Sequence, residues 1–272
     1  LDPLLVLGVG PFPRLEVVGA AVATVTAQII VLLILVAEIL RDHGEANVLH
    51  KIRLLSRPDI ACLKGVFRIG TPTALQGSLY CIISMILPRM VSGFGDGAIA
   101  VQRVGGQIES LSWNTADGFG SALNAFMGQN YGAGKKDRIF KSVRICLAMA
   151  VAVCGGIVLF LAIFCRPLFS IFTTDQNVIN IGIDMLRFMA PCYTIYVFIE
   201  VLSGALRGTG DVLLPTLITL GGVCLIRIPW IMFVLPAHHT TTCVMLSYPI
   251  SWITTTALII PYYLYRKKHA YD

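Results

Sequence analysis

Five charged residues stand inside long apolar stretches of this sequence, where a charge is costly in free energy. They are Arg103, Glu109, Asp117, Glu200 and Arg227. An unpaired carboxylate among apolar groups can bind and release a proton or hold a small cation. A carboxylate paired with an arginine instead stays ionised and fastens two helices together. The sequence supports both roles equally for Glu109.

The apolar stretches that surround these charges are long enough to cross a membrane. A helical span needs about 20 mostly apolar residues. The chain is 56% hydrophobic and 13% charged, whereas a soluble domain has about 25% charged residues. We therefore expect an all-α, polytopic membrane helix bundle with seven transmembrane helices. The predicted spans are Val17–Leu40, Ile69–Gly93, Ala98–Met127, Val143–Phe164, Phe188–Leu206, Val212–Leu235 and Thr240–Tyr265. Leu1–Gly8 is too short to span and looks like the end of an earlier helix.

Lysine and arginine are concentrated in alternate connections between the predicted spans. They crowd the connection 41–64, the turn that begins at Lys135, and the C-terminal Arg266, Lys267 and Lys268. By the positive-inside rule this side is cytoplasmic, so we expect a cytoplasmic C-terminus and the lipid bilayer as the surroundings. The net charge of +6 follows this topology and does not indicate nucleic-acid binding. Val48–Ile60 fits a helix on the membrane surface and an ordinary basic loop equally well.

The predicted span Ala98–Met127 carries too many polar residues to face lipid, so it must be enclosed by helices or line a wet cavity. Within it, Glu109 has the same predicted depth as Arg227, near the middle of the membrane, and we expect the two to pair. Asp117 and Glu200 are level with each other nearer the cytoplasm. No basic residue inside a span is level with Glu200, which favours a functional role for it.

No catalytic or metal-binding pattern stands out. Gly128–Lys136 (GQNYGAGKK) departs from a phosphate-binding loop, which needs glycine at Gln129 and serine or threonine at Lys136. His238 and His239 lie in an outer connection without a further nearby ligand. We therefore expect neither an enzyme nor a metal site.

Several segments of the chain resemble one transporter family. Ala98–Arg138 (AIAVQRVGGQIESLSWNTADGFGSALNAFMGQNYGAGKKDR) resembles the eighth helix and following loop of bacterial multidrug and toxic compound extrusion (MATE) transporters. Glu200–Thr216 (EVLSGALRGTGDVLLPT) resembles the turn between their tenth and eleventh helices. FRIGTPTALQ (Phe67–Gln76) resembles the start of their seventh helix, and LDPLLVLG with VVGAAVATVTAQ the end of the fifth and start of the sixth. The resemblance runs in order through essentially the whole chain.

The resemblance implies twelve helices in two six-helix lobes, which rock about a central cavity. Residues 1–40 would then hold the end of a fifth-like helix and a complete sixth-like helix of the N-lobe. Residues 41–64 would form a cytoplasmic bridge, and residues 65–272 the six-helix C-lobe. The acidic residue that many members carry in their first helix is not present here, and Tyr80 stands about where some members have an acid in their seventh. The missing N-lobe would be required for function.

The expected function is a secondary antiporter of the bacterial inner membrane, which exports cationic or amphipathic drugs and toxins in exchange for H⁺ or Na⁺. No other cofactor is implied. The candidate binding acids are Glu109, Glu200 and Asp117, with Arg227 as the ion-pair partner of Glu109. Candidate polar residues of the cavity are Gln76, Tyr80, Gln107, Asn114 and Tyr196. Two alternatives stay open: a flippase for a lipid-linked precursor from the same superfamily, which Arg103 and Arg227 support, and an inactive truncated fragment.

Overall fold

The computed structural model describes residues 2–8, 13–41, 59–91, 93, 95–234 and 241–269, and no strand occurs among them. The all-α prediction is therefore confirmed for this part of the chain. The chain divides into two compact units, Leu1–Leu63 and Lys64–Asp272, and we describe each by itself. Residues 48–58 of the predicted surface helix, and His238 and His239, lie outside the described residues.

The first unit contains a short helix and a long one, α1 (Asp2–Leu7) and α2 (Glu16–Arg41). They approach closely where the backbone amide of Leu15 donates a hydrogen bond of 2.9 Å to the carbonyl oxygen of Leu5. A Cβ atom at Gly19 would lie 2.5 Å from that same oxygen, so this contact requires glycine. The apolar side chains of α2 are mostly exposed within the unit, as expected for a helix that faces lipid or a further partner helix.

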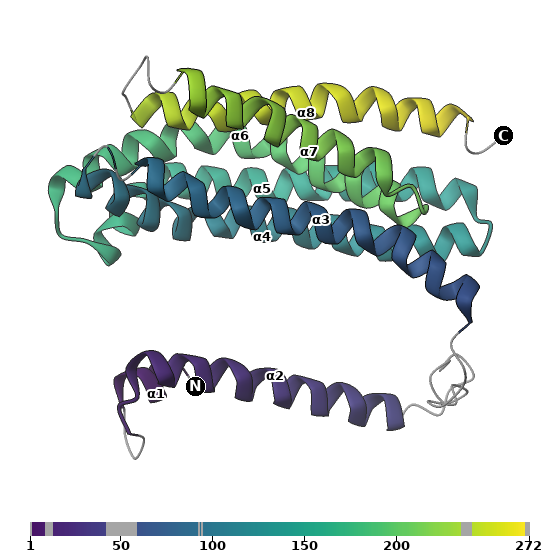
Figure 1. Cartoon of the computed structure of the whole chain (residues 1–272), viewed down its shortest axis with the longest axis horizontal. Coiled ribbons are helices and arrows are strands. Elements are labelled where there is room, and N and C mark those ends of the chain that lie inside the picture. Colours follow the sequence, from purple (N-terminus) through teal and green to yellow (C-terminus); the bar gives the residue numbers. More distant parts are fainter. Residues whose placement is uncertain are drawn as a thin grey trace. The chain divides into compact units, whose positions relative to one another are not determined.

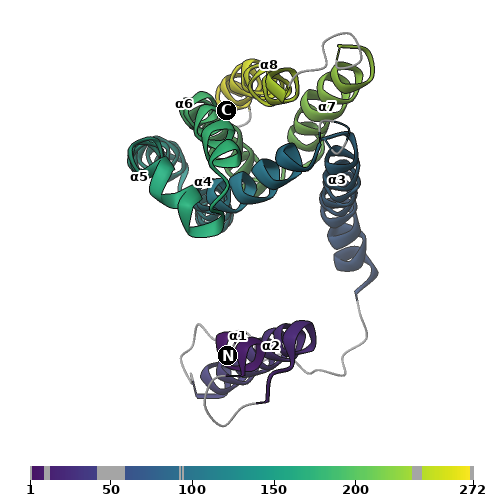
Figure 2. The same cartoon turned by 90° about the vertical axis from the view of Figure 1, so that its left-hand side faces the viewer.

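The second unit is a bundle of long helices that run side by side (Figure 1). They are α3 (Ile60–Val91), α4 (Asp96–Gly132), α5 (Lys136–Phe172), α6 (Gln176–Gly208), α7 (Leu213–Pro229), the π-helical turn η3 (Trp230–Val234) and α8 (Thr241–His269). Helix α6 packs against α4, α5 and α8, and α7 packs against α8, as the end-on view of Figure 2 shows.

Glycine and aspartate set the turns between these helices. Gly134 and Gly210 adopt φ angles of 67° and 85° directly after α4 and α6, a backbone region that glycine enters without steric cost. At the start of α6, the side chain of Asp175 accepts a hydrogen bond of 2.9 Å from the backbone amide of Asn177, which caps the helix. The long helices therefore reverse direction through short connections.

The packing between α4 and α6 depends on small residues. A Cβ atom at Gly204 would overlap the carbonyl oxygen of Gly120, and one at Gly208 would lie 2.5 Å from the carbonyl oxygen of Asn124. Ala116 and Gly120 are buried, whereas Gly118 on the same helix is exposed. The two backbones therefore touch along one face of α4, as small residues at intervals of four permit in membrane helices.

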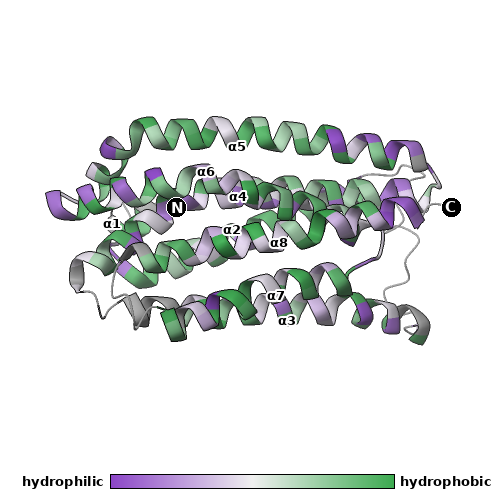
Figure 3. Ribbon diagram, turned by 90° about the horizontal axis from the view of Figure 1, so that it is seen from above, coloured by the Kyte–Doolittle hydropathy of each residue, from purple (hydrophilic) through white to green (hydrophobic). Residues whose placement is uncertain are grey.

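The outer surface of the bundle is apolar. Large side chains such as Leu159, Ile163 and Ile171 of α5 are more than half exposed. Figure 3 shows hydrophobic residues along the middle of α5 and hydrophilic residues toward its ends. Such a band matches the hydrocarbon core of a bilayer.

Six of the described helical segments are long and apolar enough to cross a membrane. They lie within α2, α3, α5, α6, α7 with η3, and α8. Helix α4 spans 37 residues, but its polar residues keep it outside this group, so the predicted count of seven is not confirmed. Helix α4 packs against α5 and α6. Glu109 is buried, whereas Arg103, Gln107, Asn114 and Asp117 are exposed, so the described helices do not enclose most of the polar residues of α4.

Candidate functional site

A cavity of about 450 Å³ opens among α3, α4, α6, α7 and α8 of the second unit. We call it the aromatic cavity. Its polar and aromatic lining residues are Tyr80, Ser84, Gln102, Trp113, Tyr196, Thr219, Arg227, Tyr248, Trp252 and Thr255. This volume is in the range of small-molecule sites, which are mostly apolar with a few placed polar groups.

Trp113 holds the aromatic wall together by contacting rings from two other helices. Its ring centroid lies 4.3 Å from that of Tyr196 and 5.1 Å from that of Trp252, both edge to face. Tyr248 extends the wall, with its centroid 5.9 Å from that of Trp252. Edge-to-face pairs are a favoured geometry for aromatic rings, so these contacts stabilise the wall.

Arg227 is the only charged side chain among the described residues that line the aromatic cavity. It is only 7% exposed. Its Nη2 donates a hydrogen bond of 3.0 Å to the hydroxyl of Ser251, and its guanidinium carbon lies 4.0 Å from the ring centroid of Tyr248. Its Nε has no hydrogen-bond partner among the described residues.

Glu109 does not line the cavity, although it is next to Trp113, which does. It is 7% exposed and stands beside Tyr193 and Trp113. Its Oε1, like the hydroxyl of Tyr193, has no hydrogen-bond partner in the described part of the chain. The expected pair with Arg227 is not formed, since no ion pair joins the two residues in that part and Arg227 turns toward Ser251 and Tyr248. A common depth did not bring the two side chains together.

Glu200 has partners on its own helix. Tyr196 donates a hydrogen bond of 2.8 Å to Oε1, and Nη2 of Arg207 lies 3.5 Å from Oε2. The sequence analysis found no basic residue inside a span at the level of Glu200, but Arg207, from the end of the predicted span, reaches back two turns of α6 to pair with it. Asp117 on α4 is exposed and lies close enough to Glu200 to act on it electrostatically. The two acids thus form one negatively charged region at the contact of α4 with α6.

The other predicted polar residues fall into two groups. Tyr80 and Tyr196 line the aromatic cavity, and Nε2 of Gln76 donates a hydrogen bond of 2.8 Å to Oγ1 of Thr219 in its wall. Gln107 and Asn114 are exposed and do not line it.

Sequence reasoning missed several residues of this site: Gln102, Trp113, Thr219, Tyr248, Ser251 and Trp252. The spacing of two rings gave a signal, because Tyr248 and Trp252 are one helical turn apart and therefore lie on the same face of their helix. Trp113 is likewise one turn from Glu109, on the same face of α4.

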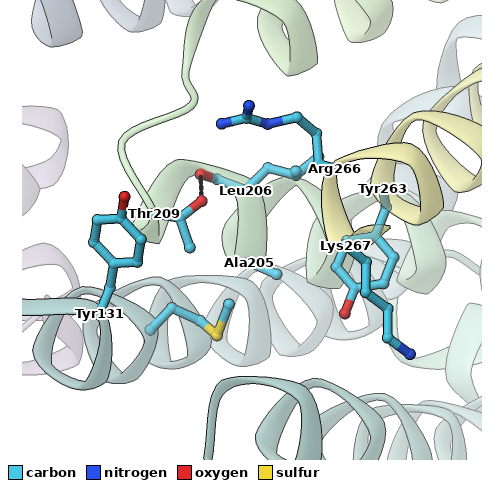
Figure 4. A pocket seen from close by; sticks show the side chains of 8 residues that line it. Tyr131, Ala205, Leu206, Thr209, Tyr263, Arg266 and Lys267 are labelled. Atoms are coloured by element: carbon cyan, nitrogen blue, oxygen red, sulfur yellow. Dashed lines mark hydrogen bonds between the residues drawn. The ribbon is translucent and has the colours of Figure 1, made fainter. Parts of the chain in front are cut away.

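A second polar group ties the turn between α6 and α7 to α8. Oδ2 of Asp211 accepts a hydrogen bond from the hydroxyl of Tyr262 and lies 2.9 Å from Nε of Arg266. Figure 4 shows a small pocket nearby, of about 20 Å³, lined by residues that include Thr209, Tyr263 and Lys267. The hydroxyl of Thr209 donates a hydrogen bond of 2.9 Å to the carbonyl oxygen of Leu206 there. A pocket of this size holds about one water, so it is not a substrate site.

Comparison with known proteins gives a consistent result. The MatE family model matches residues 72–233. The chain is 26% identical over 273 residues to the probable multidrug resistance protein YoeA of Bacillus subtilis, covering 98% of this chain and 58% of that protein. It is 29% identical over 198 residues to the FAD transporter of Shewanella oneidensis, covering 71% of this chain and 42% of that protein.

A solved structure shares the fold. A MOP superfamily transporter from Pyrococcus furiosus superposes with a TM-score of 0.84 at 19% identity, covering 98% of this chain and 59% of that one. The chain spans about half the length of the curated relatives it matches. With the six apolar helical segments, these matches identify a multi-pass membrane protein.

Proposed function

Because this chain belongs to the MATE family, we propose that it is part of a cation-coupled secondary antiporter that exports cationic or amphipathic compounds by alternating access. The resemblance that the sequence suggested to this family is confirmed by the family match over residues 72–233. Since the chain spans about half the length of its relatives, we propose that export requires a second lobe besides the helices described here. The proposed location is the bacterial inner membrane, with the C-terminus in the cytoplasm.

One contact carries the proposal: the hydrogen bond from Tyr196 to Glu200. The ring of Tyr196 lines the aromatic cavity, whereas its hydroxyl holds a carboxylate that is 17% exposed. A compound in the cavity and a cation at Glu200 would therefore act on the same side chain. That shared contact is what an antiporter needs, because each ligand must change the affinity for the other.

In this proposal Glu200 binds the coupling ion, H⁺ or Na⁺, and Asp117 adds negative charge beside it. Neutralising Glu200 would weaken both its attraction for Arg207 and the hydrogen bond that it accepts from Tyr196. A ligand shifts a two-state equilibrium only by its differential affinity for the two states. The ion would therefore favour the arrangement in which Tyr196 and Arg207 are released from Glu200.

Glu109 has a separate proposed role as a second acid, reached only when the aromatic wall moves. Its Oε1 is buried without a partner among the described residues, a costly state that a protein retains where a function uses it. Because Glu109 does not line the cavity but is next to Trp113, which does, a shift of Trp113 would let an ion or a cationic compound reach the acid.

The second candidate function is a flippase for a lipid-linked precursor. Arg227 supports it, because a phosphate-bearing lipid would find a buried guanidinium in the cavity. The aromatic wall favours export of compounds with planar rings instead. The names of the relatives agree with such cargo, since one is called a multidrug resistance protein and another an FAD transporter.

Transport in proteoliposomes tests the proposal. The transporter containing this chain would be reconstituted, and efflux of the cation ethidium and of the anion 8-anilinonaphthalene-1-sulfonate would be followed under imposed H⁺ or Na⁺ gradients. We expect gradient-driven efflux of at least one dye, abolished by Glu200→Gln and reduced by Glu109→Gln. Asp184→Asn is the matched control, because Asp184 is an exposed acid on the same helix as Glu200.

Two outcomes would contradict the proposal. If Glu109→Gln and Glu200→Gln, separately and together, leave efflux at the level of the unaltered protein, these acids do not couple transport. If neither dye moves but a fluorescent lipid-linked phosphate crosses the bilayer, the flippase function replaces the antiporter.

A further inference from the structure

The aromatic cavity contains a positive charge that forms no ion pair with a carboxylate of the described residues. Arg227 is 7% exposed, and none of the ion pairs of the described residues includes it. Glu200 of α6 forms its ion pair with Arg207 instead. Glu109 is not among the residues that line the cavity and makes no ion pair in that part of the chain. A buried charge without a counter-charge is destabilising, so this cavity is poised to accept an anion.

The guanidinium of Arg227 has N–H donors that are not used within the described residues. Arginine carries five N–H donors in a planar fork, and one of them, at Nη2, is used in the hydrogen bond to the hydroxyl of Ser251. Its Nε is buried without a partner among the described residues. Two neighbouring N–H groups of one guanidinium can grip a carboxylate, sulfonate or phosphate in a bidentate manner. Because this Nε has almost no accessible surface, an anion in the cavity would be bound through the Nη groups.

The surroundings of Arg227 define the rest of the ligand. The guanidinium lies over Tyr248, whose ring is 5.9 Å from Trp252, and Trp252 in turn is 5.1 Å from Trp113. These rings form one continuous wall that begins at the positive charge. A flat aromatic group attached to an anion would stack on the wall while the anion reaches Arg227. The remaining polar groups nearby, such as Thr219 and Gln102, are neutral.

We propose that the aromatic cavity selects anionic aromatic small molecules, whose acidic group is bound by Arg227 and whose ring is bound by Trp113, Tyr248 and Trp252. The assignment narrows the proposed export function from cationic or amphipathic compounds to anionic aromatic ones, and it rests on that function only for the statement that the ligand is transported. The sequence analysis put the acids Glu109 and Glu200 at the cargo site. The arrangement of the side chains instead gives the cavity surface a cation.

A pair of ligands with one shape and opposite charge tests the selectivity. Binding of 2-naphthalenesulfonate and of (2-naphthyl)trimethylammonium to the chain in lipid nanodiscs would be measured by isothermal titration calorimetry. We expect the sulfonate to bind at least about tenfold more tightly than the ammonium compound. Equal affinities, or tighter binding of the ammonium compound, would overturn the proposal without the need for any variant.

Variants then locate the charge. Arg227→Gln should weaken sulfonate binding by about tenfold or more and leave ammonium binding equal or stronger. Arg227→Lys, which keeps the charge but loses the fork, should fall between the two. Arg103→Gln is the matched control, because it removes an exposed arginine of α4 that does not line the cavity. If Arg103→Gln weakens the sulfonate as much as Arg227→Gln, general electrostatics explains the preference and the site is wrong.

This test is independent of transport. Sulfonate binding without gradient-driven efflux would contradict the proposed antiporter and leave the site intact. Efflux of ethidium by a protein that binds no sulfonate would contradict the proposed anion site and leave the proposed antiporter intact. Because Arg227→Gln could disturb folding, the thermal unfolding temperature of each variant is measured first, and the preference of the unaltered chain decides the outcome if that variant does not fold.

Discussion

The hydroxyl of Tyr196 lies 2.8 Å from Oε1 of Glu200, one turn further along α6. The same tyrosine contributes its ring to the aromatic cavity, so the acid is held by a residue that a bound compound would touch. On the other side of the carboxylate, Nη2 of Arg207 lies 3.5 Å from Oε2. Helix α6 therefore provides one residue of the cavity wall, the acid and its counter-charge, in that order along the chain.

The pairing of Glu200 with Arg207 predicts a measurable coupling in stability. Arg207→Gln leaves a carboxylate that is 17% exposed without its counter-charge, so we expect it to lower the free energy of unfolding by about 1–3 kcal/mol. Adding Glu200→Gln should restore part of this loss. The measurement is a double-mutant cycle by chemical denaturation in detergent micelles. If the effects of the two substitutions add to within about 0.3 kcal/mol, the ion pair makes no contribution.

Because α4 and α6 are in close contact, we expect that a single methyl group added between them destabilises the protein. Gly204→Ala would place a Cβ against the carbonyl oxygen of Gly120, and we expect a loss of about 1–3 kcal/mol in stability. Gly118→Ala is the matched control, because no atom lies within 4 Å of a Cβ added there, and it should be neutral or stabilising by up to about 1 kcal/mol. Thermal unfolding checks both. Equal effects of the two substitutions would mean that the helices are not packed as closely as described.

Asp211 joins two helix ends, which predicts local rather than global loosening on its removal. Its carboxylate accepts from Tyr262 and lies 2.9 Å from Nε of Arg266. We expect Asp211→Asn to increase amide hydrogen exchange in the turn 209–212 and at the C-terminal end of α8, while the centre of α6 stays protected. Mass spectrometry of exchanged peptides measures this, with Asp184→Asn as the control. Unchanged exchange in the turn would show that its backbone bonds suffice to hold it.

Most of the helices were predictable because they are long apolar runs bounded by basic residues, glycine or aspartate. All seven predicted spans overlap described helices, although α4 is too polar to be one of the six apolar segments, and the arrangement of side chains around the helix axes was not predicted. Glu109 and Arg227 were matched by depth, but depth says nothing about which way a residue faces, and Arg227 faces Tyr248 and Ser251. Arg207 was overlooked because it was placed at the end of the span, although its long side chain reaches back to Glu200.

The aromatic wall was harder to predict than the charges. Its rings come from α4, α6 and α8, and the spacing within each helix cannot say which helices lie together. Trp113 could equally have anchored α4 at the membrane surface, a common role for tryptophan. Only the close approach of α4 to α6, set by glycines distant in sequence, brings Trp113 to Tyr196.

Glu109 predicts a conflict between stability and function. Its Oε1 is buried without a hydrogen-bond partner among the described residues, which costs about 1–3 kcal/mol for a polar group in such a position. Glu109→Met fills a similar volume without a polar atom, so we expect the free energy of unfolding to rise by about 1–3 kcal/mol. If Glu109 takes part in coupling, the same substitution should reduce gradient-driven dye efflux.

A neighbouring residue separates the two effects. Ser112 lies on the same helix, is 3% exposed, and its hydroxyl likewise has no partner among the described residues. Ser112→Ala should therefore raise stability by up to about 1 kcal/mol and leave efflux unchanged, because it removes an unpaired polar atom but no acid. Chemical denaturation and efflux are measured on the same preparations. A Glu109→Met protein that is less stable and yet exports normally would mean that the carboxylate is a structural anchor, held by Tyr193 and Trp113.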